Sequence, residues 1–275
     1  MKKHFAFTLL LVIIIPLFQG CEKKGNPPVL PPAGSMIMDF SNFRDAAKSD
    51  YSLPGIKGAE DVNYSLAKTV VGIWNTLLFV NLAIPVAAFQ KAIENKPSYL
   101  DNKKWQWKYN VNVLSATYTA RLTGQITSAN VKWEMYISRE GAGGFPEFLW
   151  FEGTTALDGK SGRWTLNESR EAQVPFLQID WQMTGTEVGS VKYTYIKNGS
   201  SFKDSYIEYG LKTGSYNAFY NVYFYESTAY MRFVTVDIEW NTSGHNGRIK
   251  AADYFGDTAW HCWDSNGNDI TCPAR

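Results

Sequence analysis

The sequence has few of the residues, and none of the short motifs, on which most enzyme and nucleic-acid sites depend. It contains three cysteines and three histidines, and charged residues make up 19% of its 275 positions. No Gly-x-Ser-x-Gly elbow, His-Glu-x-x-His helix, glycine-rich phosphate loop or Cys-x-x-Cys pair occurs. The formal net charge is +1, whereas nucleic-acid binders carry a clear excess of positive charge. The sequence therefore predicts no cofactor, no metal and no nucleic-acid partner.

The remaining composition is that of a folded protein. Aromatic residues make up 15% of the chain and hydrophobic residues 45%, which is far from the composition of disordered segments. The length allows one large all-β domain or two small ones, and either can bury a core.

The first twenty residues have the pattern of a cleaved export signal. Met1–His4 is basic, Phe5–Phe18 is apolar, and Gly20-Cys21 follows. The apolar run is shorter than the roughly 20 residues that span a bilayer. We therefore expect residues 1–20 to be a signal peptide. Its removal takes away two lysines and no acid, which leaves 25 basic against 26 acidic side chains.

A cysteine directly after a small residue at the end of such a run resembles the lipobox of bacterial lipoproteins. In that family the thiol receives a diacylglycerol and the peptide is cut before the cysteine. The resemblance implies that Cys21 is lipidated, that membrane lipid is a partner, and that the protein lies at the bacterial cell envelope. An ordinary secretory peptide that leaves Cys21 free is the alternative. Residues 21–58, with Pro27-Pro28 and Pro31-Pro32, are interpreted as an extended tether.

Residues 59–97 are expected to form an apolar helical segment. Val70–Phe89 contains no charged residue and is rich in Leu, Val and Ala, which favours helix over strand. Pro85 removes one amide donor within the run, so we expect a kink or two consecutive helices. A helix that is apolar on every face is buried in protein or in lipid. The polar Asn75 and Asn81 favour burial against the β-domain, and a transmembrane span is the alternative.

Residues 98–275 are predicted to be an antiparallel β-domain, because apolar and polar residues alternate along one segment after another. The clearest are 105–113, 116–126 and 131–138. Further strands are expected at 147–154, 162–167, 174–183, 190–196, 205–211, 216–225, 230–240, 247–254 and 258–263. The fold class is therefore mainly β, or α+β if the helix is counted. So long a meander is expected to form a barrel or a strongly curved sheet, and a transmembrane barrel is the less favoured alternative.

The two remaining cysteines are predicted to form a disulfide. Cys262 and Cys272 flank a turn-forming segment that contains Asn266-Gly267. A hairpin there would bring the two cysteines opposite each other, and an exported chain keeps such a bridge oxidised.

Three carboxylates are weak candidates for catalysis. Asp237 and Glu239 lie two apart in a predicted strand, so both point to one face, and Asp180 occurs in a similar Ile-Asp-Trp context. Paired carboxylates hydrolyse glycosides, and the neighbouring Trp181 and Trp240 offer faces on which a sugar would stack. A polar strand face is the simpler interpretation.

These features leave three classes of function. The leading one is a non-enzymatic lipoprotein that binds or carries a hydrophobic ligand or acts as an envelope scaffold, because an apolar helix can cover a cavity in an aromatic-rich sheet. The second is a surface carbohydrate-binding module. The third is a glycan-cleaving enzyme that uses Asp180, Asp237 and Glu239.

Overall fold

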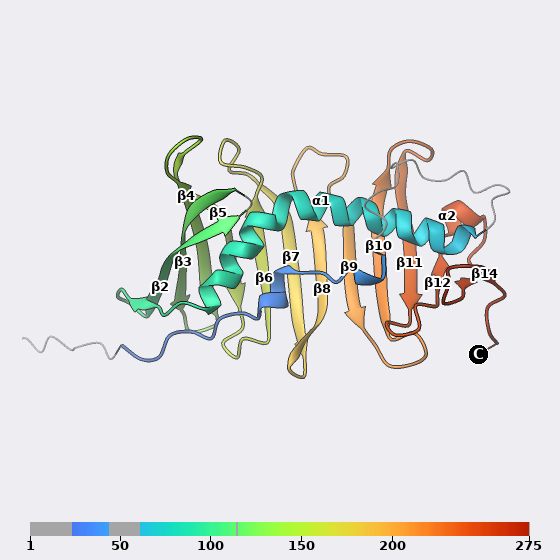
Figure 1. Ribbon diagram of the computed structural model, residues 1–275, viewed down its shortest axis with the longest axis horizontal. Coiled ribbons are helices and arrows are strands. Elements are labelled where there is room, and N and C mark those ends of the chain that lie inside the picture. The colour runs from blue at the N-terminus through green and yellow to red at the C-terminus, as the bar shows by residue number, and fades with distance from the viewer. Residues whose placement is uncertain (1–23, 44–60, 114, 275) are drawn as a thin grey trace, which may run out of the picture.

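The computed structural model describes residues 24–43, 61–113 and 115–274 (Figure 1). The predicted signal peptide, the predicted lipidation site Cys21 and part of the predicted tether lie outside these residues. The described residues contain one antiparallel sheet of 14 strands, whose order in space follows their order in the sequence.

The strands agree closely with the alternation in the sequence. Their bounds are β1 Ser98–Tyr99, β2 Lys104–Val113, β3 Ala116–Ile126, β4 Val131–Arg139, β5 Phe145–Thr155, β6 Ser161–Asn167, β7 Pro175–Thr184, β8 Glu187–Tyr195, β9 Tyr206–Leu211, β10 Ala218–Glu226, β11 Arg232–Trp240, β12 Gly247–Lys250, β13 His261–Trp263 and β14 Asp269–Ile270. The strand predicted over 247–254 ends early, because the chain forms a helical turn, α2, at Ala252–Phe255. Gly256, with a positive φ of 78°, ends that turn.

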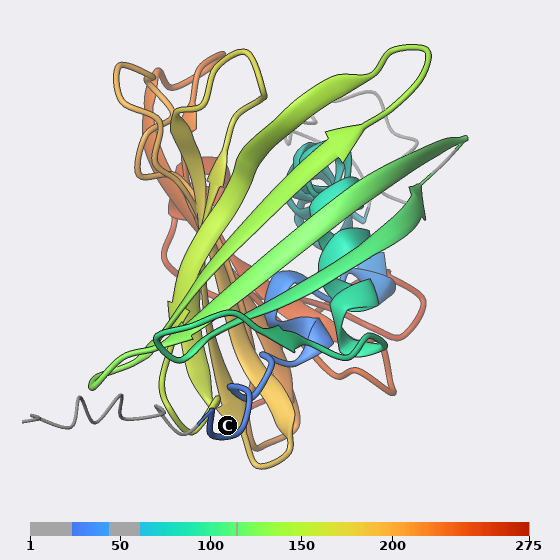
Figure 2. The same ribbon diagram turned by 90° about the vertical axis from the view of Figure 1, so that its left-hand side faces the viewer.

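The sheet is open and is not closed into a barrel. A barrel needs its first and last strands to pair, but β1 and β14 lie at opposite edges of the sheet. The strands near β2 run diagonally across those near β11 in the end-on view (Figure 2), so the sheet is twisted along its length. The prediction of an antiparallel meander is confirmed, and the barrel is not.

The long helix α1, Val62–Ile93, lies across one face of the sheet (Figure 1). It bends by 61° between its segments Val62–Phe79 and Asn81–Ile93. The bend has a local cause: Pro85 has no N–H to donate to the carbonyl of Asn81, and the Asn81 side chain donates to the Leu77 carbonyl oxygen at 2.7 Å.

The bend bears on whether α1 could cross a membrane. Among the described residues, no single helix is long and apolar enough to cross a bilayer. The two segments of α1 taken together are long and apolar enough, by length and composition only.

The core lies between the sheet and two segments that cover it. We call the covered side the inner face and the opposite side the outer face. Residues 24–43, which we call the strap, run beside α1 over the inner face and include the short 3-10 helix η1, Ala33–Met36 (Figure 1). The largest fully buried side chains of the sheet are tryptophans on the inner face: Trp107, Trp133, Trp164, Trp240 and Trp263.

Candidate binding groove between α1 and the strap

An apolar groove of about 300 Å³ runs between α1 and the strap. Its size is at the lower end of the range of roughly 300–1,000 Å³ that small-molecule sites occupy. None of the described residues that line it is charged. They are Met36, Ile37, Met38, Phe40, Asn75, Leu78, Phe79, Leu82, Ala83, Val86, Ala87, Gln90 and Tyr193.

Side chains of the inner face hold the strap wall of the groove in place. The Tyr193 hydroxyl, from β8, donates to the Met36 carbonyl oxygen at 2.8 Å, and the Trp164 indole N–H donates to Ser35 Oγ at 3.3 Å. The Tyr220 hydroxyl donates to the Asp39 carbonyl oxygen. Burial raises the pKa of Tyr193, so its hydroxyl stays protonated as the donor. The sheet thus fixes the strap by three hydrogen bonds. The bonds from Tyr193 and Trp164 join buried groups, which are costly to leave without a partner.

The helix wall of the groove comes from the region around the bend. Leu78 and Leu82 are buried one turn apart on the groove side of α1. Phe79 lines the rim, with 70% of its surface exposed. A phenylalanine this exposed beside an apolar groove marks a surface on which a further apolar group would gain by burial.

The strap lies within the tether predicted over residues 21–58, but it packs on the sheet and contributes buried side chains to the core. Met36 and Met38 are buried while Ile37 between them is exposed. Every second residue of this run, Met36, Met38 and Phe40, packs on the core. This two-residue period directly follows the proline-rich part of the strap. This short run was the signal in the sequence for the strap side of the groove, which the sequence analysis did not identify. The helix side of the groove, from Asn75 to Gln90, lies within the predicted helical segment 59–97.

The three candidate carboxylates do not come together. All lie on the outer face, but Asp180 is on β7 and the other two are on β11. Four strand spacings of about 4.8 Å separate these strands by about 19 Å, whereas glycosidase carboxylates lie within about 10 Å of each other.

Each candidate carboxylate is also paired with a cation. Arg163 donates to Asp180 at 2.6 Å, and Lys250 lies 2.9 Å from Asp237. Glu239 accepts from Lys212 and, at 2.6 Å, from Arg248. Burial raises the pKa of Glu239, but its hydrogen bonds from Lys212 and Arg248 outweigh this and hold the pKa below the ordinary 4.5. A general acid needs a raised pKa, so the ion-paired Glu239 is poorly suited to that role.

The two tryptophans proposed as sugar-stacking faces are not accessible. Trp181 is 3% exposed and Trp240 is 1% exposed, and both belong to the core. Successive residues of a strand point to opposite faces, so each tryptophan lies on the face opposite its carboxylate neighbour, Asp180 or Glu239.

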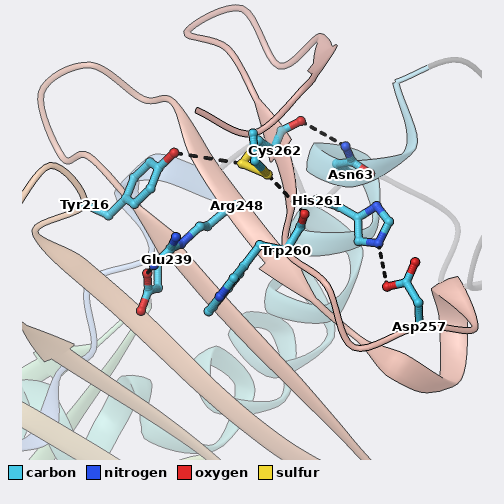
Figure 3. Close-up of a disulfide and its surroundings, with 9 residues drawn as sticks. Asn63, Tyr216, Glu239, Arg248, Asp257, Trp260, His261 and Cys262 are labelled. Carbon is cyan, nitrogen blue, oxygen red and sulfur yellow. Dashed lines mark hydrogen bonds and ion pairs between the residues drawn. A yellow bond between two sulfur atoms is a disulfide. The ribbon is translucent and has the colours of Figure 1, made fainter. Parts of the chain in front are cut away.

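The predicted disulfide between Cys262 and Cys272 is present (Figure 3). Its geometry differs from the expected one in one respect. Cys262 pairs with Ile270 across β13 and β14, so Cys272 lies two residues beyond the residue directly opposite. The Cα atoms of the two cysteines are 5.1 Å apart, which is within the usual range for disulfides.

A second, polar pocket of about 360 Å³ borders this disulfide. The Arg248 guanidinium lies between the rings of Tyr216 and Trp260, at 4.9 Å and 4.3 Å from their centroids, and is paired with Glu239 (Figure 3). These contacts put the guanidinium within cation–π distance of two rings and in an ion pair with Glu239. The arrangement is a satisfied ion-pair network, and the apolar groove is the better candidate for a ligand.

The two histidines that the structure describes, His245 and His261, make local contacts. His261 is 3.0 Å from Asp257 and stacks on Phe255, and His245 contacts Asn42 in a turn. In the ranges that the structure describes, no three His, Cys, Asp or Glu residues are grouped so as to hold a metal ion.

Comparisons with known proteins add no relative: no family model, curated protein or solved structure matches the chain. The function is therefore inferred from the geometry.

Proposed function

We propose that this protein is a lipid-anchored protein of the bacterial cell envelope that holds the aliphatic chain of a hydrophobic ligand between α1 and the strap. The observation that carries the proposal is the groove itself. It is uncharged, is bounded by buried leucines and methionines, and is open beside the exposed Phe79.

An aliphatic chain fits these walls better than a rigid or charged molecule. Each methylene that leaves water contributes about 0.8 kcal/mol. Methionines such as Met36 and Met38 adapt their shape to flexible apolar partners. Asn75 and Gln90 provide the amide groups in the lining, which suits a ligand with one uncharged or weakly polar end. None of the described lining residues is charged, so these residues offer no counter-ion to an ionic head group.

The anchor is proposed from the signal-like residues 1–20 and Cys21. Two aliphatic chains on Cys21 would keep the protein at a membrane, which is also the source of an aliphatic ligand. Replacement of Cys21 by Ser should release the protein from the membrane fraction or block its processing. Normal maturation together with undiminished membrane association would contradict the anchor, without bearing on the groove.

The groove is tested with a photoreactive fatty acid fed to cells that produce the full-length protein. After irradiation, peptide mapping should find the label on peptides that contain Met36–Phe40 or Leu78–Gln90. A label confined to the peptide that begins at Cys21 would report lipidation alone and would overturn the groove proposal.

A matched pair of variants sharpens this experiment. Ala83→Trp places an indole in the groove and should reduce labelling of the strap peptide several-fold. Ser65→Trp places the same side chain on an exposed position of the same helix, outside the groove. Labelling of the Ser65→Trp protein should match the parent. Equal loss in both variants would mean that the groove does not hold the probe.

A further inference from the structure

The two sides of the molecule present opposite kinds of side chain. On the outer face, charged residues of different strands form ion pairs, among them Arg121–Glu147, Arg163–Asp180 and Lys250–Asp237. On the other side, α1 lies over the sheet (Figure 1), and its sequence has no charged residue from Thr69 to Gln90. A helix that faces water normally has a polar outward side. This part of α1 therefore lacks the surface that suits contact with water.

Exposed apolar side chains lie around the bend of α1. Leu77 is 36% exposed and Phe79 is 70% exposed, on either side of the buried Leu78. Ile37 of the strap is 40% exposed and lines the same groove as Phe79. We call Ile37, Leu77 and Phe79 the α1 surface. Exposed apolar residues that cluster in this way mark a surface for an apolar partner.

Polar side chains of α1 near this surface form hydrogen bonds within the helix. At the bend, the amide of Asn81 donates to the Leu77 carbonyl oxygen at 2.7 Å. Nearer the start of α1, the Thr69 hydroxyl donates to the Ser65 carbonyl oxygen at 2.9 Å. Polar groups that enter a bilayer need partners within the protein. These bonds reduce the cost of moving this part of α1 out of water.

The strap begins on the same side of the sheet. The Lys24 Nζ atom lies 5.1 Å from the centroid of the Trp105 ring, and Trp105 is buried on the inner face. Figure 1 shows this start at the end of the molecule where α1 ends. Cys21 precedes Lys24 by three residues, a distance of at most about 11 Å in an extended chain. The lipid proposed on Cys21 would therefore enter a bilayer close to the end of α1.

We infer that the α1 surface docks on the lipid bilayer, with the bend of α1 inserted among the acyl chains. The inference rests on the proposed function, because the lipid on Cys21 and the aliphatic ligand both bring a bilayer to this side of the molecule. The groove opens beside Phe79, so a chain passes from the bilayer into the groove without crossing water. A protein partner on the same surface would close this opening.

Charged residues near the α1 surface limit the depth of insertion. Lys68 and Lys91 border the uncharged part of α1. Asp39 is exposed on the strap, and its carboxylate accepts from the Ser41 N–H at 2.8 Å. In the proposed orientation these charges lie among the lipid head groups, where lysine side chains extend toward water. The docking is therefore peripheral, and it adds a second attachment to the lipid anchor.

The proposal is tested by measuring the depth of single positions in vesicles. The full-length protein is reconstituted into vesicles of phosphatidylethanolamine and phosphatidylglycerol that contain a lipid with a nitroxide on its acyl chain. A nitrobenzoxadiazole probe is attached to Leu77→Cys, because Leu77 does not line the groove. The matched control is Phe202→Cys, which is 45% exposed in the parent chain and contacts Tyr225 of the outer face. The parent chain gives the background labelling.

The two positions should respond to opposite quenchers. The nitroxide lipid should quench the probe at position 77, and iodide in the water should quench the probe at position 202. Equal quenching of both probes by iodide would overturn the docking. Protection of position 77 from both quenchers would mean that protein covers this surface, and would also overturn it.

A measurement without a probe uses a second pair of variants. Phe79→Ser and Phe202→Ser each remove an exposed ring, so both proteins should melt at temperatures close to that of the parent chain. Transfer to unlabelled acceptor vesicles should become about tenfold faster or more for Phe79→Ser, because a phenylalanine no longer leaves water. Transfer of Phe202→Ser should match the parent chain. Equal transfer rates for the two variants would contradict insertion at the bend.

The result is separable from that of the groove experiment. Quenching of position 77 by the nitroxide lipid, with no fatty-acid label in the groove, would support the docking and reject the ligand. Labelling of the groove, with position 77 open to iodide, would support the ligand and reject the docking.

Discussion

The two ends of the sheet are stabilised in opposite ways. At the first end, the two-residue β1 is followed by the ten-residue β2. The inner face of β2 is covered by the second half of α1, where the Tyr109 hydroxyl donates to the Ala88 carbonyl oxygen at 2.5 Å. At the last end, β13 and β14 contain three and two residues. The Cys262–Cys272 disulfide joins this end covalently.

The first turn of α1 adds a second connection at the last end. The Asp269 carboxylate accepts from the backbone N–H groups of Val62 and Asn63 at 2.9 Å and 3.0 Å. Asn63 Nδ2 donates in turn to the Cys262 carbonyl oxygen at 2.9 Å. An acidic group at a helix N-terminus satisfies unpaired donors and interacts favourably with the helix dipole.

The comparison shows two solutions to the problem of a sheet edge. Short strands form too few ladder hydrogen bonds to hold their own edge, so the last end depends on a disulfide and a helix cap. The long β2 is held by its ladder with β3 and by its buried inner face. The following predictions test this difference, beginning with the largest effect.

Buried tryptophans should matter equally at both ends. Trp263→Ala and Trp107→Ala each remove a fully buried indole, and each should lower the free energy of unfolding by about 3–5 kcal/mol. Urea unfolding followed by circular dichroism measures both. A loss of less than about 1 kcal/mol for Trp263→Ala alone would show that the last end is not part of the cooperative core.

Loss of the disulfide should affect only the last end. A Cys262→Ala/Cys272→Ala protein should lose about 2–3 kcal/mol, because a bridge over so short a loop restricts the unfolded chain by about that amount. Hydrogen exchange should increase in β13 and β14 and remain unchanged in β2. Unchanged stability of the double variant would mean that the disulfide does not stabilise the last end of the sheet.

Side-chain hydrogen bonds to α1 should have smaller and comparable effects at the two ends. Asp269→Ala removes the cap of α1 and should cost about 1 kcal/mol, seen as faster amide exchange at Val62 and Asn63. Tyr109→Phe removes the hydroxyl bond to Ala88 and should also cost about 1 kcal/mol. If amide exchange is unchanged in the Asp269→Ala protein, the cap is not holding the helix end.

Acid should weaken the last end slightly through Glu239. Because the pKa of Glu239 is lower in the folded protein than its ordinary 4.5, its contribution is present above that value and is lost as the pH falls through the folded pKa. The effect should not exceed about 1 kcal/mol. Glu239→Gln should remove this part of the pH dependence, as measured by melting temperature between neutral and acidic pH. If the melting temperature of the Glu239→Gln protein depends on pH as in the parent chain, Glu239 does not contribute to the acid sensitivity.

The sequence was sufficient for features that depend on local pattern. Period-two alternation located the strands from β2 to β11, because each strand has one buried and one exposed face. The apolar run located α1, and Pro85 located its bend. Cysteine number and spacing indicated the disulfide, since two cysteines on either side of a turn must lie close together. The helix wall of the groove lies within the helical segment predicted over residues 59–97, because its residues belong to the same apolar run.

Tertiary structure alone decided whether the sheet closed and which faces were covered. Closure depends on whether the terminal strands meet, and the two-residue β1 and β14 have no periodicity to read. The position of the strap depends on hydrogen bonds from Tyr193, Trp164 and Tyr220, which are distant in the sequence. The pairing of Asp180, Asp237 and Glu239 with cations depends on strand register. Each of these requires contacts between residues far apart in the chain, and alternation within a single strand carries no information about them.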